Sequence, residues 1–241
     1  MAGAGVLAGA INAIVGSGSL ITFPTLVGLG LPPLVANVSN TVGLVPGSIS
    51  GAIGYRRELA GQRSRTIRLG LFSALGGLAG GILLLAVPHS FQEVVPWLVL
   101  LAVAMVIVQP RLSGWLARRG RHPGADGGWA LRGGIFATGI YGGYFGAAQG
   151  VLLIGLLGLG VDDDLQRLNA LKNVLAAVVN GVAAVLFIFD APVRWVPALI
   201  LAGGSIVGGQ LGARVGRRLP ANVLRAIIVV GGVAVAVKLL V

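Results

Sequence analysis

The stretch AINAIVGSGSLITFPTLVGLGLPP, residues 10–33, decides the fold of this chain. Its two outer parts are apolar enough to lie in lipid, but its centre is a run of small residues, 16–19, and Pro24 follows. Glycine and proline interrupt helices, so the stretch is predicted to be a helix broken at its centre. Backbone outside a helix is tolerated at membrane depth only where protein buries it or where it lines a wet cavity. The break therefore indicates either a functional site or a packing kink.

The composition is that of an integral membrane protein. Of the 241 residues, 56% are hydrophobic and only 10% are charged, whereas soluble proteins carry about 25% charged residues. No stretch between the apolar runs has a core pattern of its own, so residues 1–241 are predicted to form a single polytopic membrane domain. The runs that are long enough, or nearly so, to cross a hydrocarbon core of about 30 Å lie at 34–54, 69–87, 94–108, 168–189, 195–212 and 223–241.

Charge, cysteine count and histidine spacing exclude several functions. The formal net charge of +11 would suggest a nucleic-acid partner in a soluble protein, but the arginines lie in short loops beside apolar runs, where they set orientation in the membrane. No nucleic-acid partner is expected. The chain has no cysteine, and neither His89 nor His122 has a second histidine at metal-ligand spacing. Catalytic residues, metal ligands and cofactors are therefore not predicted. The first basic residue is Arg56, so no cleavable signal peptide is expected.

The same order of features occurs twice, about 125 residues apart. In the first half the broken segment ends in GLGLPP, and ANVSNTVGLVPGS and GGLAGG follow; in the second half GGYFGAAQG and GLGVDD precede LNALKNVLAAVVNG and GGSIVGGQLG. The predicted organisation is repeat one at 1–110, a basic cytoplasmic linker at 111–128 and repeat two at 129–241. Glycines four apart allow helices to approach closely. The glycines predicted to lie at helix contacts are Gly76, Gly80, Gly204, Gly208 and Gly212.

Three arginine-rich loops, at 55–68, 110–130 and 213–222, predict the topology. The positive-inside tendency places all three in the cytoplasm. Three apolar segments separate the second loop from the third, so a simple count of crossings would place one loop outside. The conflict disappears if residues 130–160 enter the membrane, turn at their glycine break and return on the same side, and if residues 3–32 do the same. A single helix of this length would be about 45 Å long, too long for one comfortable crossing.

The predicted fold is therefore an all-α integral membrane protein made of two inverted repeats. Each repeat has a glycine-broken re-entrant helical hairpin and three transmembrane helices. Eight crossing helices are the alternative. Matched breaks in the two halves favour a central site, because a packing kink would explain one break more easily than two.

The quoted segments resemble the sulfite exporter TauE/SafE family of membrane transporters. The first half resembles the glycine-rich break, the proline after it and the polar span of that family, and GIYGGYFGAAQG, LNALKNVLAAVVNG and GGQLGARVGRRLP resemble its second repeat. The resemblance covers nearly the whole chain. It implies export of sulfite, other sulfur oxyanions or organosulfonates. Where the family often has runs of glycine, this chain has Ser17 and Ser19 in the first break and residues 147–149, AAQ, in the second. These departures leave the substrate open.

A helix that begins at a glycine break offers an anion free N–H groups and the positive end of the helix dipole. Serine, threonine and amide side chains beside the breaks add donors, although each could instead satisfy nearby backbone. The predicted substrate-binding residues are Gly16, Ser17, Gly18, Ser19, Thr22, Asn40, Thr41, Gly146, Gln149, Gly150, Lys172 and Asn173.

Lys172 is the ionisable residue that lies well inside an apolar run. A lysine at the centre of a bilayer costs about 2.5–3.5 kcal/mol on insertion scales, so Lys172 is expected to face the bundle interior or a water-filled cavity. Two alternatives stay open. Lys172 could snorkel to the interface, or it could pair with Asp162, Asp163 or Asp164, which lie about ten residues before it.

The predicted function is transport, as an exporter, of a small anion across a bacterial-type plasma (inner) membrane by a multi-pass protein. No aspartate or glutamate lies deep in a predicted span, so the coupling ion is open. The rival functions are a non-transporting membrane scaffold or assembly factor, whose glycines serve packing alone, and an anion channel. An enzyme is not expected. The expected partners are the small anionic substrate and the lipid bilayer, and the oligomeric state is open, a homodimer included.

Overall fold

The computed structural model describes residues 1–118, 128–215, 233, 236–237 and 239. Every element in this part of the chain is an α-helix, which confirms the all-α class. The predicted last span, 223–241, lies mostly outside the described residues, as does most of the third arginine loop. The helices are α1 (Ala2–Ile14), α2 (Ser19–Gly28), α3 (Pro33–Gly54), α4 (Arg63–Ala86), α5 (Pro88–Arg118), α6 (Gly128–Tyr144), α7 (Gln149–Gly160), α8 (Leu165–Asp190) and α9 (Trp195–Val215).

Among the described helices, 4 are long and apolar enough to cross a membrane. They are Arg63–Ala86, Pro88–Leu116, Leu165–Asp190 and Trp195–Arg214. By contrast, α1, α2 and α7 have only 13, 10 and 12 residues, and a crossing helix needs about 20. The outer surface is apolar: the side chains of Phe189, Val196 and Leu199 are 80%, 69% and 64% exposed. These features are those of a multi-pass membrane protein, because such side chains are stable against lipid and unfavourable in water.

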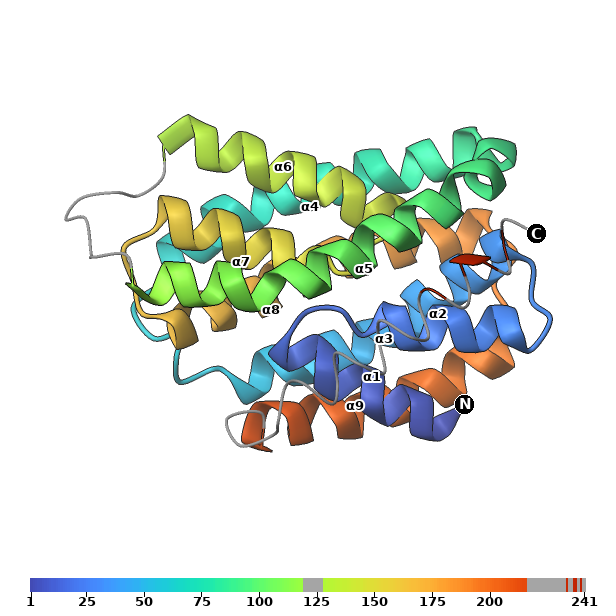
Figure 1. Cartoon of the computed structure of the whole chain (residues 1–241), viewed down its shortest axis with the longest axis horizontal. Helices are drawn as coiled ribbons and strands as arrows, with labels where there is room; N and C mark the ends of the chain where they lie inside the picture. The colour runs from blue at the N-terminus through green and yellow to red at the C-terminus, as the bar shows by residue number, and fades with distance from the viewer. Residues whose placement is uncertain (119–127, 216–232, 234–235, 238, 240–241) are drawn as a thin grey trace.

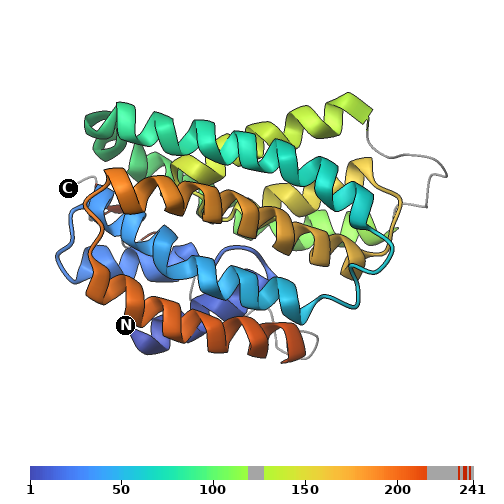
Figure 2. The same cartoon turned by 180° about the vertical axis from the view of Figure 1, so that it is seen from behind.

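The helices form two layers. Figure 2 shows one layer in the order α4, α8, α3 and α9, and each of these helices contacts the next. The other layer holds α5 and the four helices next to the breaks, and it faces the viewer in Figure 1. The two central helices of the first layer are therefore α3 and α8, one from each half of the chain. They carry the polar spans that the sequence singled out.

The two halves exchange packing partners in a regular way. The helix before the first break, α1, packs against α9, and the helix before the second break, α6, packs against α4. Likewise α3 packs on α9, and α8 packs on α4. Each half therefore buries its first helix mainly against the other half.

Glycines make these exchanged contacts close. A Cβ added to Gly80 would lie 2.1 Å from the carbonyl oxygen of Ile140, and one added to Gly208 would lie 2.0 Å from the carbonyl oxygen of Val6. Small residues at such contacts let helix backbones approach each other directly. The five predicted contact glycines all face the partner helix, which confirms the prediction for Gly76, Gly80, Gly204, Gly208 and Gly212.

Two helical hairpins open at opposite ends of the bundle. In Figure 1, α1 and α2 turn near the middle of the molecule and open to the right, whereas α6 and α7 open to the left. The side chain of Leu131, near the start of α6, lies against Gly160, the last residue of α7. The second hairpin therefore returns to the end from which it began.

The arginine-rich segments lie together at one end of the bundle, on the left in Figure 1. The last residue of α3, Gly54, lies against Ala213 near the end of α9. At the same end, Arg65 of α4 pairs with Asp163, just before α8, at 3.1 Å. The structure thus brings the described parts of the three basic loops to a common end, as the arginine pattern predicts.

Two of the helices extend beyond the predicted apolar runs. α4 begins at Arg63, inside the predicted loop 55–68, and α5 continues to Arg118, inside the predicted linker 111–128. The remainder of that linker, up to residue 127, lies outside the described residues. The boundaries differ from the prediction because an arginine side chain can extend from a helix to the membrane surface, so a helix does not have to end where its apolar run ends.

Candidate functional site

The two breaks are built by the same backbone hydrogen bonds. In the first, the N–H groups of Gly16 and of the residue before it both donate to the carbonyl of Ile11, at 3.1 and 2.7 Å. In the second, the N–H groups of Gly146 and of the residue before it both donate to the carbonyl of Tyr141, at 3.0 and 2.9 Å. Gly16 and Gly146 have φ of 81° and 73°, in the left-handed region that glycine adopts without a Cβ clash. Both predicted breaks are therefore present and have matching geometry.

The two breaks meet inside the bundle. The N–H group of Gly150 donates to the carbonyl oxygen of Gly16 at 3.1 Å. A Cβ added to either glycine would lie 2.4 Å from the Cα of the other. Both residues are buried. Backbone from opposite halves of the chain is thus in direct contact, which only glycine allows.

Two helices begin at this meeting point, α2 with Ser19 and α7 with Gln149. The amide N–H groups of Ser17, Gly18 and Ser19 have no acceptor in the part of the chain that the structure describes. Ser17 Oγ and Gln149 Nε2 are buried and also lack a hydrogen-bond partner there. A helix N-terminus carries about half an elementary positive charge. The meeting point therefore offers unused donors beside the positive ends of two helices, which suits an anion with oxygen acceptors.

Lys172 lies beside the first break, at the end of α1. Its Nζ is 3.4 Å from the carbonyl oxygens of Asn12 and Ala13, and the residue is 1% exposed. The amide of Asn173 also donates to the Ala13 carbonyl, at 3.1 Å. The last carbonyls of a helix have no partner within the helix and lie at its negative end. Lys172 therefore neutralises the negative end of α1 close to the positive end of α2.

The two alternatives for Lys172, an extension of its side chain to the membrane interface and a pair with Asp162, Asp163 or Asp164, are wrong. Asp163 accepts from Arg65 at 3.1 Å and from Arg167 at 2.7 Å, so this carboxylate is paired with arginines. Within the described residues, the hydrogen bonds of the Lys172 ammonium go to backbone carbonyls alone. Because the side chain is buried, it does not snorkel to the membrane surface. Lys172 is an interior charge, as its position in the apolar run predicts.

The predicted polar residues of the first half, in α2 and in the polar span of α3, make different hydrogen bonds. Thr22 donates to Oδ1 of Asn40, which ties α2 to α3. Thr41 donates to the carbonyl of Asn37 within its own helix, at 3.0 Å, which is the local backbone satisfaction that the sequence left open. Ser19 is only half-buried. The structure therefore joins the two breaks, Lys172 and Asn173 into one region, and it does not bring the Thr41 hydroxyl into it.

Two asparagines were missed by the sequence-based site prediction. Asn37 Nδ2 donates to the carbonyl of Tyr144, the last residue of α6, at 3.0 Å. Asn169 Nδ2 lies 3.4 Å from the carbonyl of Ala13 near the end of α1. Each asparagine satisfies the end of the half-helix that belongs to the other half of the chain. The internal repeat contains a signal for this role, because Asn37 and Asn169 lie at matching positions of the two polar spans.

The matched breaks, polar spans and glycine contacts run through the whole chain, and so does a match to a known family. The family model described as Sulfite exporter TauE/SafE matches residues 1–239. This chain belongs to the sulfite exporter TauE/SafE family. Membership confirms the resemblance seen in the sequence, and it indicates that this TauE/SafE protein is a membrane transporter.

Relatives of this TauE/SafE protein have similar lengths. "Probable membrane transporter protein YfcA" of Escherichia coli (strain K12) is 28% identical, and the match covers 98% of this chain and 86% of the relative. "Probable membrane transporter protein ORF9" of Sinorhizobium sp is 27% identical, with 98% and 90% covered. "Probable membrane transporter protein" of Haemophilus influenzae is 26% identical, with 94% and 88% covered. No solved structure matches this TauE/SafE protein.

Proposed function

We propose that this TauE/SafE protein exports a small anion, sulfite or another sulfur oxyanion or organosulfonate, across a bacterial-type plasma membrane. The observation that carries the proposal is the meeting of the two breaks, where α2 and α7 begin and where the buried donors of Ser17 and Gln149 lack a partner within the described residues. Sulfur oxyanions carry several oxygen acceptors, and backbone N–H groups at helix N-termini bind such oxygens without a further charge. The description of the family, sulfite exporter, supports this substrate class.

Lys172 adds the fixed positive charge to the proposed site. Without it, an anion at the breaks would lie close to the negative end of α1, which would oppose binding. With the ammonium on the carbonyls of Asn12 and Ala13, the potential around the first break is dominated by the lysine and by the N-terminus of α2. A hydrogen bond from an ammonium to an oxyanion is about twice as strong as one between neutral groups. Lys172 is therefore proposed as the residue that makes the site selective for anions.

We infer that residues 1–110 and 129–241 are inverted repeats, and that α1–α2 and α6–α7 are re-entrant hairpins. The exchanged packing partners, α1 on α9 and α6 on α4, are what a two-fold axis between the halves would produce. The opposite openings of the two hairpins agree with opposite orientations of the halves. The arginine-rich end is assigned to the cytoplasm. Since Gly16 and Gly150 are buried where the breaks meet, substrate access requires the halves to move apart alternately on each side.

Flux into liposomes that contain the purified protein tests the proposed function. The panel is sulfite, sulfate, thiosulfate, sulfoacetate, taurine, lactate and chloride, with protein-free liposomes as the control. The proposal expects saturable flux and counterflow for at least one sulfur anion, and thermal stabilisation by the same anion. A ligand at 100 times its Kd adds about 2.7 kcal/mol to the stability of the bound state. Absence of flux with every anion would support a scaffold, and flux that neither saturates nor shows counterflow would support a channel.

A further inference from the structure

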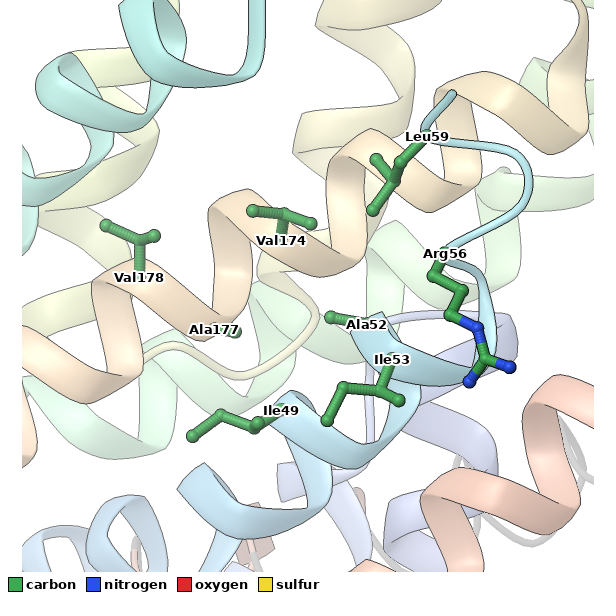
Figure 3. Close-up of a pocket in the computed structure, with 8 residues that line it drawn as sticks. All are labelled: Ile49, Ala52, Ile53, Arg56, Leu59, Val174, Ala177 and Val178. Atoms are coloured by element: carbon green, nitrogen blue, oxygen red, sulfur yellow. The ribbon is translucent and has the colours of Figure 1, made fainter. Parts of the chain in front are cut away.

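A groove lies between α3 and α8, and its volume is about 390 Å³. α3 contributes Ile49 and Ile53, and α8 contributes Val174 and Val178 (Figure 3). At 3.6 residues per turn, the two valines lie on the face of α8 opposite to Lys172. The groove is therefore on the outside of the layer, and no predicted substrate-binding residue lines it.

The groove exists because two alanines, Ala52 and Ala177, stand where larger side chains would fill the seam between the helices. Its rim is open, since Ile49 and Ile53 are 48% and 50% exposed. A hollow with this lining offers no hydrogen-bonding group along its length apart from the residue at its end. This lining suits an apolar occupant, such as a hydrocarbon chain, rather than a polar solute.

One charged residue, Arg56, lies at the end of the groove. Figure 3 shows its guanidinium directed away from the apolar side chains. Arg56 is exposed, and within the described residues its side chain has no hydrogen bond or ion pair. It follows the last residue of α3 by two positions, at the arginine-rich end of the bundle. Ile49 lies five positions before the last residue of α3, about 7.5 Å along the helix at 1.5 Å per residue. A cation at the membrane surface thus stands above an apolar channel that runs into the bilayer.

We propose that this groove binds an anionic phospholipid, with one acyl chain between α3 and α8 and the lipid phosphate on Arg56. The charges decide the class of lipid. A guanidinium presents a fork of donors that matches phosphate oxygens. The headgroup of an anionic lipid carries no cation of its own that would compete with Arg56 for the phosphate. The occupant joins the two halves of the chain at the outer seam of their central helices. The proposal is independent of which anion the protein transports.

Lipid titration of the delipidated, full-length protein in detergent tests the site, with native mass spectrometry and thermal unfolding as readouts. Phosphatidylglycerol should bind about fivefold more tightly than phosphatidylcholine of the same chain length, the factor expected from one arginine near a membrane surface. Arg56→Gln should remove this preference. The matched control is Arg57→Gln, since Arg57 is also exposed and does not line the groove; it should leave the preference unchanged. Ala177→Leu fills the groove and should weaken binding of both lipids.

Three results would overturn the proposal. The first is an undiminished preference for phosphatidylglycerol in Arg56→Gln, or an equal loss in Arg57→Gln, which would mean that the basic surface acts as a whole. The second is stabilisation by inorganic phosphate equal to that by the lipid, which would indicate a free-ion site. The third is a dimer of the wild-type protein that Ala177→Leu dissociates while lipid binding is unchanged, because a second copy would then occupy the groove. Each variant is first checked for a single symmetrical peak in size-exclusion chromatography.

Discussion

Gly150→Ala tests whether the contact between the two breaks is required for transport. The new Cβ would lie 2.4 Å from the Cα of Gly16, whereas ordinary van der Waals contact begins at 3.4 Å. The two breaks must therefore separate by about 1 Å, the difference between these distances. The neighbour is backbone, so no side-chain rotation can relieve the clash. The same displacement stretches the 3.1 Å hydrogen bond from Gly150 to Gly16.

The expected magnitudes follow from these contacts. Overpacking of a close-packed interior costs about 1–3 kcal/mol, and loss of one hydrogen bond costs about 0.5–1.5 kcal/mol. Alanine recovers about 0.5–1 kcal/mol relative to glycine in a helix. The free energy of unfolding should therefore fall by about 1–3 kcal/mol. Transport should fall further, by about 100-fold, because a displacement of about 1 Å at a functional site has effects of this size on enzymes.

Unfolding in detergent measures the stability, and flux into liposomes measures transport. The control is Gly203→Ala in α9, whose new Cβ meets nothing within 4 Å. It should keep wild-type flux and gain about 0.5–1 kcal/mol of stability from the better helix propensity of alanine. Wild-type flux together with wild-type stability in Gly150→Ala would refute the reasoning. So would an equal loss in Gly203→Ala, since that residue touches neither break.

Three further predictions concern charge and topology. Lys172→Met should weaken anion binding by about 10- to 100-fold, the value of a charged hydrogen bond, while the free energy of unfolding stays unchanged or rises because a burial cost is removed. Lys172→Arg should retain part of the affinity with altered selectivity. Unchanged anion binding in the methionine variant would mean that the backbone of the breaks alone holds the anion. The native chain has no cysteine, so single engineered cysteines can be labelled specifically. Cysteines that replace Ser64 and Arg214 should react with an impermeant reagent from one side of the membrane, and a cysteine that replaces Trp195 should react from the other side. Any other labelling pattern contradicts the proposed topology. Asp163→Asn removes two part-buried ion pairs and should lower the free energy of unfolding by about 1 kcal/mol, less at high salt. The control Asp162→Asn should have no measurable effect on the free energy of unfolding.

The sequence by itself determined the class of protein, the breaks and the candidate family. Hydropathy, arginine clusters and glycine runs are local properties, and they can be read without knowing which segments meet. The same holds for the contact glycines: Gly80 and Gly208 were recognised from their spacing alone, because a glycine four residues from another on a helix creates a smooth face. The internal repeat made the matched positions of Gly16 and Gly146 visible before any packing was known.

Only the tertiary structure decided which groups lie together. The hydrogen bond from Gly150 to Gly16 and the ammonium of Lys172 on the carbonyls of Asn12 and Ala13 join opposite halves of the chain. The periodicity of a segment predicts which face of its helix is buried, but not which other helix packs on that face. The sequence could therefore place Lys172 inside the bundle without indicating that it would neutralise the end of α1. The choice of α9 for α1 and of α4 for α6 depends on the summed packing of whole helix faces, and it is this packing that brings the two breaks together.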